Sequence, residues 1–216
     1  MSNQKQYDSL LEIVKSRRSI RQFKPDPIPV EYIDKIINVA LWAPSGFHTQ
    51  PWEFVVVKKK ELKDKIADAI NQPENAGYRD APVFILLLGD WRAKVGLPGT
   101  VQAQDRLVDN LFCSSLASAF LYMHLAAATL GLTSCWVSAS SAPEPQRKIK
   151  ELLHIPEPLK IYDMLAAGYR AHSPVPKTVL RNRKDAVHYD DSGVFRTDEE
   201  VMAYAEKTKA WCISAH

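Results

Sequence analysis

The sequence has few cysteines, few glycines and no strong excess of charge of one sign. Its 216 residues include 3 cysteines and 8 glycines, and the formal net charge is +3. So mild an excess argues against nucleic acid or an anionic membrane as a partner. Cys113, Cys135 and Cys212 lie far apart without CxxC spacing, and an odd number cannot pair completely. We therefore expect a reducing, cytoplasmic compartment.

Targeting signals and the familiar ligand-binding motifs are also missing. The start, "MSNQKQYDSLLEIV", lacks the basic residues and apolar stretch of a secretory signal, so none is expected. The histidines show no HxxxH or Cys/His spacing, so we expect no metal site. Neither GxxxxGK[ST] nor a GxGxxG after a strand is present. A bound phosphate would therefore have to be held by side chains.

One long run does lack charge. The segment from Leu111 to Leu132 contains no Asp, Glu, Lys or Arg, and its length would suffice to cross a bilayer. Several serines, His124 and a strand-like segment that starts two residues later favour a helix buried in a soluble core or a subunit interface. We interpret His124 as a hydrogen-bonded core residue, and Cys113 and Cys135 as small core residues.

Helix-like and strand-like segments alternate along the chain without a regular βαβ order. Apolar spacing predicts helices over residues 7–17, 31–43, 59–70 and 105–132. Short apolar runs predict strands over residues 53–58, 81–89, 134–139 and 160–169. This order favours an α+β fold with one sheet packed between helices. Apolar spacing at Val201, Tyr204 and Ala205 predicts one more helix in the tail.

The stretch "SRRSIRQF", Ser16 to Phe23, brings three arginines and two serines together. An unpaired buried guanidinium is very costly, so these arginines are either solvated or hold an anion. Arginine offers a planar fork of donors that matches phosphate oxygens, and Ser19 adds a hydroxyl. Taken alone, a solvated basic helix end is the simpler interpretation.

A second motif, "APSGFHTQPWEFVVV", runs from Ala43 to Val57 after the second predicted helix. Its first residues are loop formers, and polar His48 and Gln50 precede a buried strand. A purely structural loop would explain this pattern too. Its many donors are nevertheless well suited to the edge of a planar polar ring.

With the proline-rich spacer between them, these two motifs resemble the nitroreductase family of flavin-dependent oxidoreductases. The segments "LGLTSCWVSA" and "AAGY…RNRKDAVHYD" follow in the family's order, so the resemblance spans about residues 7–190. It implies a central, mainly antiparallel sheet packed between helices in an intertwined homodimer, with two FMN sites at the subunit interface. Residues 1–190 would form the FMN-binding domain and residues 191–216 a C-terminal helical extension. The long uncharged helix would form the dimer core.

The resemblance also implies contacts to FMN from the arginine motif. Arg17, Arg18 and Ser19 would hold the phosphate and ribityl end, and Arg21 would face the pyrimidine edge of the ring. Arg181 would close on the phosphate from the later motif.

Further implied contacts come from the loop and from the third strand. The loop residues, which would reach the flavin from the partner subunit, are Pro44, Ser45, Gly46 and His48. The main chain near the flavin N5 and O4 would belong to Val137, Ser138 and Ala139. His48 stands where the family commonly has asparagine, and Ser138 where glycine is frequent.

The implied chemistry belongs to the cofactor. FMN would take hydride from NADH or NADPH and pass two electrons to a nitroaromatic, quinone or similar electron-poor acceptor in ping-pong turnover. Arg21 would stabilise the negative charge that reduction leaves on the ring, and no protein nucleophile or base is expected. One alternative is a specialised flavin enzyme of the same fold, a reductive dehalogenase or flavin-fragmenting enzyme, which residues 90–106 would decide. Another is a non-catalytic flavin-binding sensor.

Overall fold

The computed structural model describes residues 2–71, 73–172, 178, 180–183, 186–189 and 195–214. The chain divides into two compact units, Met1–His172 and Ser173–His216. The second unit contains the helix α7, Asp198–Ser214, where the apolar spacing of the tail predicted one. The predicted boundary of the functional domain at residue 190 stays a prediction.

The first unit is built on a four-stranded antiparallel sheet with the strand order β1-β2-β4-β3. The strands are β1 (Trp52–Val57), β2 (Val83–Asp90), β3 (Thr133–Val137) and β4 (Leu159–Gly168). Each is an apolar or β-branched run, as strands generally are. All four lie where the sequence predicted strands, except that β3 ends at Val137 and a 3-10 turn follows it.

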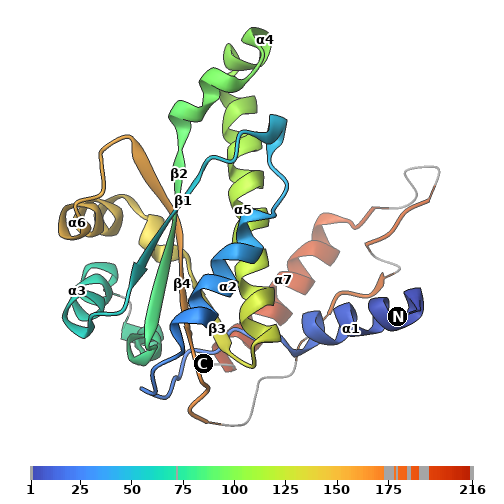
Figure 1. Cartoon of the computed structure of the whole chain (residues 1–216). Helices are drawn as coiled ribbons and strands as arrows, with labels where there is room; N and C mark the ends of the chain where they lie inside the picture. Colours follow the sequence, from blue (N-terminus) through green and yellow to red (C-terminus); the bar gives the residue numbers. More distant parts are fainter. Residues whose placement is uncertain are drawn as a thin grey trace. The chain divides into compact units, whose positions relative to one another are not determined.

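Helices cover both faces of this sheet. Figure 1 shows α2 and α5 on one face and α3 and α6 on the other. The helices of this unit are α1 (Asn3–Ser16), α2 (Val30–Leu41), α3 (Lys60–Ile70), α4 (Gly99–Gln102), α5 (Asp105–Thr129) and α6 (Pro143–Leu153). Short 3-10 segments are η1 (Gly46–His48), η2 (Pro73–Asp80), η3 (Trp91–Gly96) and η4 (Ser138–Ser141). The predicted α+β fold, with its sheet packed between helices, is confirmed.

The core consists of two apolar layers that share β2. Ile85 and Leu87 face α2 and α5, whereas Phe84 and Leu86 face α3 and α6. This alternation follows from the period of two along a strand. Because both faces are covered, every residue from Val83 to Gly89 is buried. Burying one such large apolar side chain contributes about 1.5–3 kcal/mol.

The long helix α5 is buried on one side only. Leu116 and Phe120 are fully buried, whereas Leu107 and Leu121 are 37% and 45% exposed. The expectation that Cys113 is a core residue is wrong, because its side chain is exposed. By length and composition α5 could cross a membrane, but half of its most apolar window is buried inside the chain.

Candidate functional site

The arginine motif lies beside β3. It leaves the end of α1, and Ser19 forms a parallel bridge to Ser134, the second residue of β3. The backbone N–H of Ile20 donates to the Ser134 carbonyl at 3.1 Å. Further along, Phe23 forms an antiparallel bridge to Arg170. The motif is therefore held in an extended conformation against the sheet.

His124 of α5 supports the same place from within the core. Its Nδ1 lies 2.7 Å from Ser134 Oγ, and its ring stacks on Trp136 with centroids 5.4 Å apart. Burial, reinforced by the charge of Arg17, lowers the pKa of His124 to about 3, so the ring is neutral at pH 7. His124 Nε2 has no hydrogen-bond partner in the described part of the chain. As the sequence predicted, His124 is a buried, hydrogen-bonded core residue.

Arg17 and Arg18 are both partly buried but differ in their partners. The Arg18 Nη1 donates to the carbonyls of Lys15 and, at 2.8 Å, Arg17, so it satisfies the end of α1. Burial is the main cause that lowers the pKa of Arg17, and the charge of Arg18 lowers it further. Neither arginine forms an ion pair with a carboxylate of the described residues. Arg17 is therefore better placed than Arg18 to bind an added anion.

The main chain of Arg21 is held by a close contact with η2. A Cβ atom on Gly77 would lie 2.1 Å from the Arg21 carbonyl oxygen, so only glycine fits there. Burial raises the pKa of Cys135 in β3, and the Arg21 charge opposes this effect. The Arg21 charge therefore acts on the middle of β3, and a turn follows this strand.

That turn contains the predicted main-chain contacts. Val137 ends β3, and Ser138 and Ala139 open η4. The Ser140 hydroxyl donates to the Val137 carbonyl at 2.8 Å, and the Ser141 hydroxyl donates to the Ser138 carbonyl at 2.7 Å. These bonds fix the turn at the end of β3. The arginine motif joins the same strand near its start, at Ser134, so the structure brings two of the predicted groups to one edge strand.

A buried carboxyl group near this turn was missed by the sequence reasoning. Asp163 is 6% exposed, and its Oδ2 accepts a hydrogen bond from Trp136 Nε1. Burial raises the pKa of Asp163 to about 6, against the opposing effect of the Trp136 bond. Its Oδ1 has no hydrogen-bond partner among the described atoms. The available signal was a single acidic residue inside the apolar run "KIYDMLAAG".

The loop of the second motif is anchored to α5. The Gly46 backbone N–H donates to Ser115 Oγ at 3.1 Å. A Cβ atom at Gly46 would lie 2.9 Å from Leu111 Cδ2, so the loop backbone approaches α5 closely here. Pro44 is exposed, and Ser45 Oγ accepts the backbone N–H of Gln50 at 3.1 Å. The loop thus presents a fixed backbone on the outside of α5.

Three non-glycine residues of this loop adopt left-handed backbone conformations. Their φ angles are 52° at Phe47, 57° at His48 and 44° at Gln50. Each such residue costs on the order of 1 kcal/mol, and such strain clusters at functional sites. Phe47 is 57% exposed, and His48 Nε2 lies 2.9 Å from Gln50 Nε2. The strained backbone presents an aromatic ring and an imidazole to the surface.

Within one chain the loop and the arginine motif meet α5 at different places. Ser115 anchors the loop and His124 supports the motif, nine residues further along the helix. At 1.5 Å per residue these anchors lie about 14 Å apart along the axis. This separation agrees with the assignment of the loop to the site of a partner subunit, which stays a prediction. Arg181 belongs to the second unit, and its assignment to the phosphate also stays a prediction.

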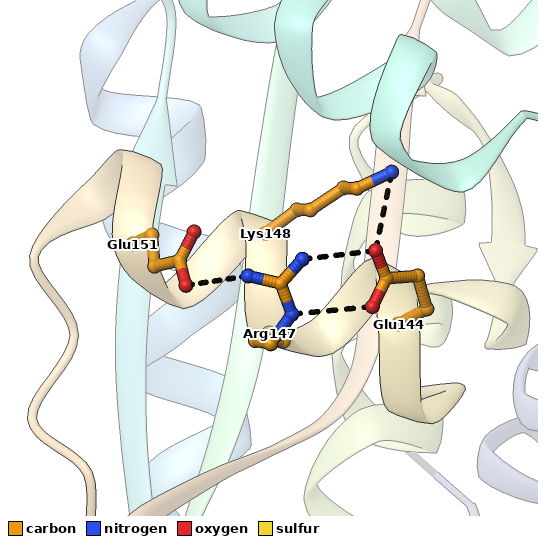
Figure 2. A network of polar contacts seen from close by, with 4 residues as sticks. All are labelled: Glu144, Arg147, Lys148 and Glu151. Carbon is orange, nitrogen blue, oxygen red and sulfur yellow. Dashed lines mark hydrogen bonds and ion pairs between the residues drawn. The ribbon is translucent and has the colours of Figure 1, made fainter.

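A cavity of about 870 Å³ lies beside α6, away from these residues. Its cations already have partners. Arg147 pairs with Glu144 at 2.9 Å and with Glu151 at 2.7 Å, in the network that Figure 2 shows. Lys150 donates to the Glu157 carbonyl, and Lys160 lies over the ring of Trp91. The cavity therefore offers little unpaired charge to recruit a ligand.

The comparisons with known sequences agree with the motifs. Residues 14–169 match the model of the Nitroreductase family. A protein of Methanothermobacter thermautotrophicus, provisionally named an NADH dehydrogenase/NAD(P)H nitroreductase, is 34% identical over 165 residues, 76% of this chain and 79% of that protein. Iodotyrosine deiodinase 1 of Rattus norvegicus is 48% identical over 67 residues, 31% of this chain and 24% of the deiodinase.

Solved structures share the fold. An FMN-dependent nitroreductase of Clostridium difficile R20291 has a TM-score of 0.65 and 26% identity, covering 84% of this chain and 99% of that chain. The NADPH:FMN oxidoreductase of Vibrio harveyi, in complex with NAD+, has a TM-score of 0.75 and 21% identity, covering 94% of this chain and 85% of that chain. The second likeness shows the fold alone.

Proposed function

The chain belongs to the nitroreductase family, and from this premise we propose that it is an FMN-dependent oxidoreductase that passes two electrons from NAD(P)H to electron-poor acceptors. Nitroaromatics and quinones are the proposed acceptor class. The observation that carries the proposal is the arginine motif, bound along β3 with Arg17 unpaired by any carboxylate of the described chain.

The residues present fit a phosphorylated flavin. Arg17 would bind the phosphate, with Ser19 as a hydroxyl donor and Arg181 as a further cation. Arg18 would contribute its charge while its Nη1 stays on the end of α1. Arg21 would face the pyrimidine edge, and the main chain of residues 137–139 would face N5 and O4. When bound, FMN would supply the hydride-accepting and electron-donating chemistry.

The side chains of this chain would then position and stabilise rather than react. The backbone of Arg21 lies against Gly77, and its positive charge would stabilise the charge that reduction adds to the ring. The Ser140 and Ser141 hydroxyls would hold the η4 turn rigid against the ring. Donor and acceptor would use the same pocket in turn, which is ping-pong kinetics.

We propose a homodimer in the cytoplasm, in which each loop of residues 44–48 completes the site of the partner. The exposed side of α5 supports this arrangement. It carries Leu107 and Leu121 at 37% and 45% exposure, together with Ser114 and Ser118 between them. These residues are seven, four and three positions apart along the helix, and this is the spacing at which a second helix packs.

A second candidate is reductive dehalogenation of a halogenated aromatic. The 48% identity to a deiodinase over 67 residues exceeds the 34% identity to the nitroreductase-named relative, although it covers a smaller part of the chain. Removal of halogen would use the same flavin site and the same two electrons, so the two candidates differ in the acceptor only.

The test begins with the purified protein. We expect a yellow protein that releases FMN on denaturation and oxidises NADH or NADPH when menadione or a nitroaromatic is added. Release of iodide from iodotyrosine by the reduced protein would favour the second candidate. A protein that binds FMN but reduces none of these acceptors would be a sensor. A colourless protein that also fails to bind added FMN would refute the flavin proposal.

A further inference from the structure

A pocket of about 320 Å³ lies away from all the predicted flavin contacts. It lies between the proline-rich segment before α2, the start of α3 and the start of β2. Four cations line it: Lys58, Lys60, Lys63 and Arg79. Asp80 is the one acidic residue of its lining. The pocket therefore has an excess of positive charge that the flavin chemistry does not use.

The ammonium group of Lys63 is the central feature of this pocket. Lys63 is only 7% exposed, and its Nζ donates to the Ala81 carbonyl and lies 5.6 Å from the centre of the Phe84 ring. Burial lowers the pKa of Lys63. No carboxylate of the described side chains lies within ion-pair distance of it. Since an ammonium has three N–H donors, one carbonyl leaves most of its capacity unused.

Asp64 and Asp80 act on Lys63 by their charge, but neither forms an ion pair with it. A buried cation without an ion-pair partner is costly, and an anion in the pocket would supply that partner. The cations at the rim of the pocket could also bind the anion, and the stability lost by breaking their present ion pairs would be small. Lys60 pairs with Asp64 at 2.6 Å and Arg79 pairs with Asp68 at 2.7 Å, and both pairs are largely exposed. Exposed ion pairs contribute little stability, so either cation could turn to an anion in the pocket.

The other walls of the pocket are apolar. They are formed by Pro25, Pro27, Ile28, Pro82 and Val83. Prolines have a fixed φ and so form rigid walls. An anionic end therefore has a cationic partner, and the remainder of the molecule has an apolar surface to bury. We propose that this pocket binds a small organic anion, a phosphate or carboxylate group on a compact apolar body.

The proposal does not depend on the flavin site, and the test keeps the two apart. The protein as purified, in a chloride buffer, is titrated calorimetrically with inorganic phosphate, phenyl phosphate and benzoate. We expect saturable binding of at least one anion. Lys63→Gln should weaken it by about tenfold or more, because a charge-assisted hydrogen bond is lost. Lys65→Gln, an exposed lysine of the same helix, is the matched control and should change it less than about twofold.

A second variant avoids the core. Lys60→Ala with Arg79→Ala removes only rim cations, keeps Lys63, and should also weaken binding.

The three probes test the chemistry of the bound anion. If phenyl phosphate binds more tightly than inorganic phosphate, the ligand has an apolar body, and equal affinities refute an apolar body. Benzoate bound more tightly than phenyl phosphate assigns the carboxylate, and the reverse order assigns the phosphate. No saturable binding of any probe, or equal losses in the Lys63 and Lys65 variants, would overturn the proposal. The proposal would also be overturned if an anion releases flavin from the protein and binds to Lys63→Gln as tightly as to the wild type.

Discussion

His124 Nδ1 of α5 lies 2.7 Å from Ser134 Oγ of β3, and the carbonyl of the same Ser134 accepts the backbone N–H of Ile20. One serine thus connects the long core helix, the edge strand and the arginine motif. Its side chain faces the helix while its main chain faces the motif. The arginine motif is therefore bonded to the same residue that His124 contacts in the core.

Ser134→Ala should destabilise the protein, because it leaves the buried Nδ1 of His124 without a partner. Such a loss costs about 1–3 kcal/mol. Urea unfolding of the wild type and the variant measures the difference. The control is Ser118→Ala, which removes a hydroxyl that bonds only to the Ser114 carbonyl of its own helix. Equal effects of the two changes would contradict a special role for Ser134.

The periodicity of the sequence predicted the elements around this serine. The run "APVFILLLG" fits a buried strand, and β2 is buried from Val83 to Gly89. The segment "SCWVSA" predicted a strand, and its first four residues lie in β3. Local pattern suffices in such cases, because strand and helix periods are properties of consecutive residues.

Other features could not be predicted, because they depend on residues far apart in the sequence. Cys113 and Cys135 both have apolar neighbours in sequence, yet only Cys135 is buried. Which side of α5 faces the sheet is decided by packing against β2, not by local composition. The bond between Trp136 and Asp163 likewise joins residues of different strands. The left-handed Phe47 is held by a loop whose anchor, Ser115, is distant in sequence.

Two buried groups should give the stability opposite dependences on pH. The pKa of His124 falls from 6.5 unfolded to about 3 folded, so the unfolded chain binds more protons between these values and stability falls as the pH is lowered. The pKa of Asp163 rises from 3.8 to about 6, so the folded chain binds more protons between these values and stability falls as the pH is raised. Between about pH 4 and pH 6 the changes that His124 and Asp163 make to the free energy of unfolding are opposite in sign and cancel.

Asp163→Asn should therefore expose the contribution of His124. The free energy of unfolding of this variant should rise by about 1.4 kcal/mol per pH unit between about pH 4 and pH 6, relative to the wild type. Urea unfolding at several pH values measures this slope. His124→Asn should give the opposite slope in the same window. Parallel stability curves for both variants and the wild type would show that these groups do not titrate as described.

Leu121→Arg should break the proposed dimer. Leu121 is 45% exposed on the side of α5 turned away from the sheet, so a charge there would be buried without a partner in the interface. Sedimentation should show a monomer, and flavin occupancy should fall with it. Val95→Arg is the control, since Val95 is 78% exposed on η3. A monomeric wild type that keeps its flavin would contradict the shared site.

The last prediction separates Arg17 from Arg21. Arg17 has no carboxylate partner among the described residues and should bind the phosphate, so Arg17→Ala should mainly weaken FMN binding. The loss of a charge-assisted hydrogen bond costs about 1.5–3 kcal/mol, or about tenfold to a hundredfold in affinity. Lys15→Ala, which removes an exposed charge at the end of α1, is the control and should leave the affinity nearly unchanged.

Arg21 should instead respond to charge that appears only on reduction. Arg21→Ala should lower the two-electron midpoint potential of the bound flavin and slow its reduction by NAD(P)H, with a smaller loss of oxidised FMN than in Arg17→Ala. For a two-electron couple, about 1.4 kcal/mol corresponds to about 30 mV, which spectroelectrochemistry resolves. The contact with Gly77 involves the Arg21 carbonyl oxygen and not its side chain, so the variant keeps that contact. If Arg21→Ala keeps the parent potential and loses FMN as Arg17→Ala does, both arginines belong to the phosphate.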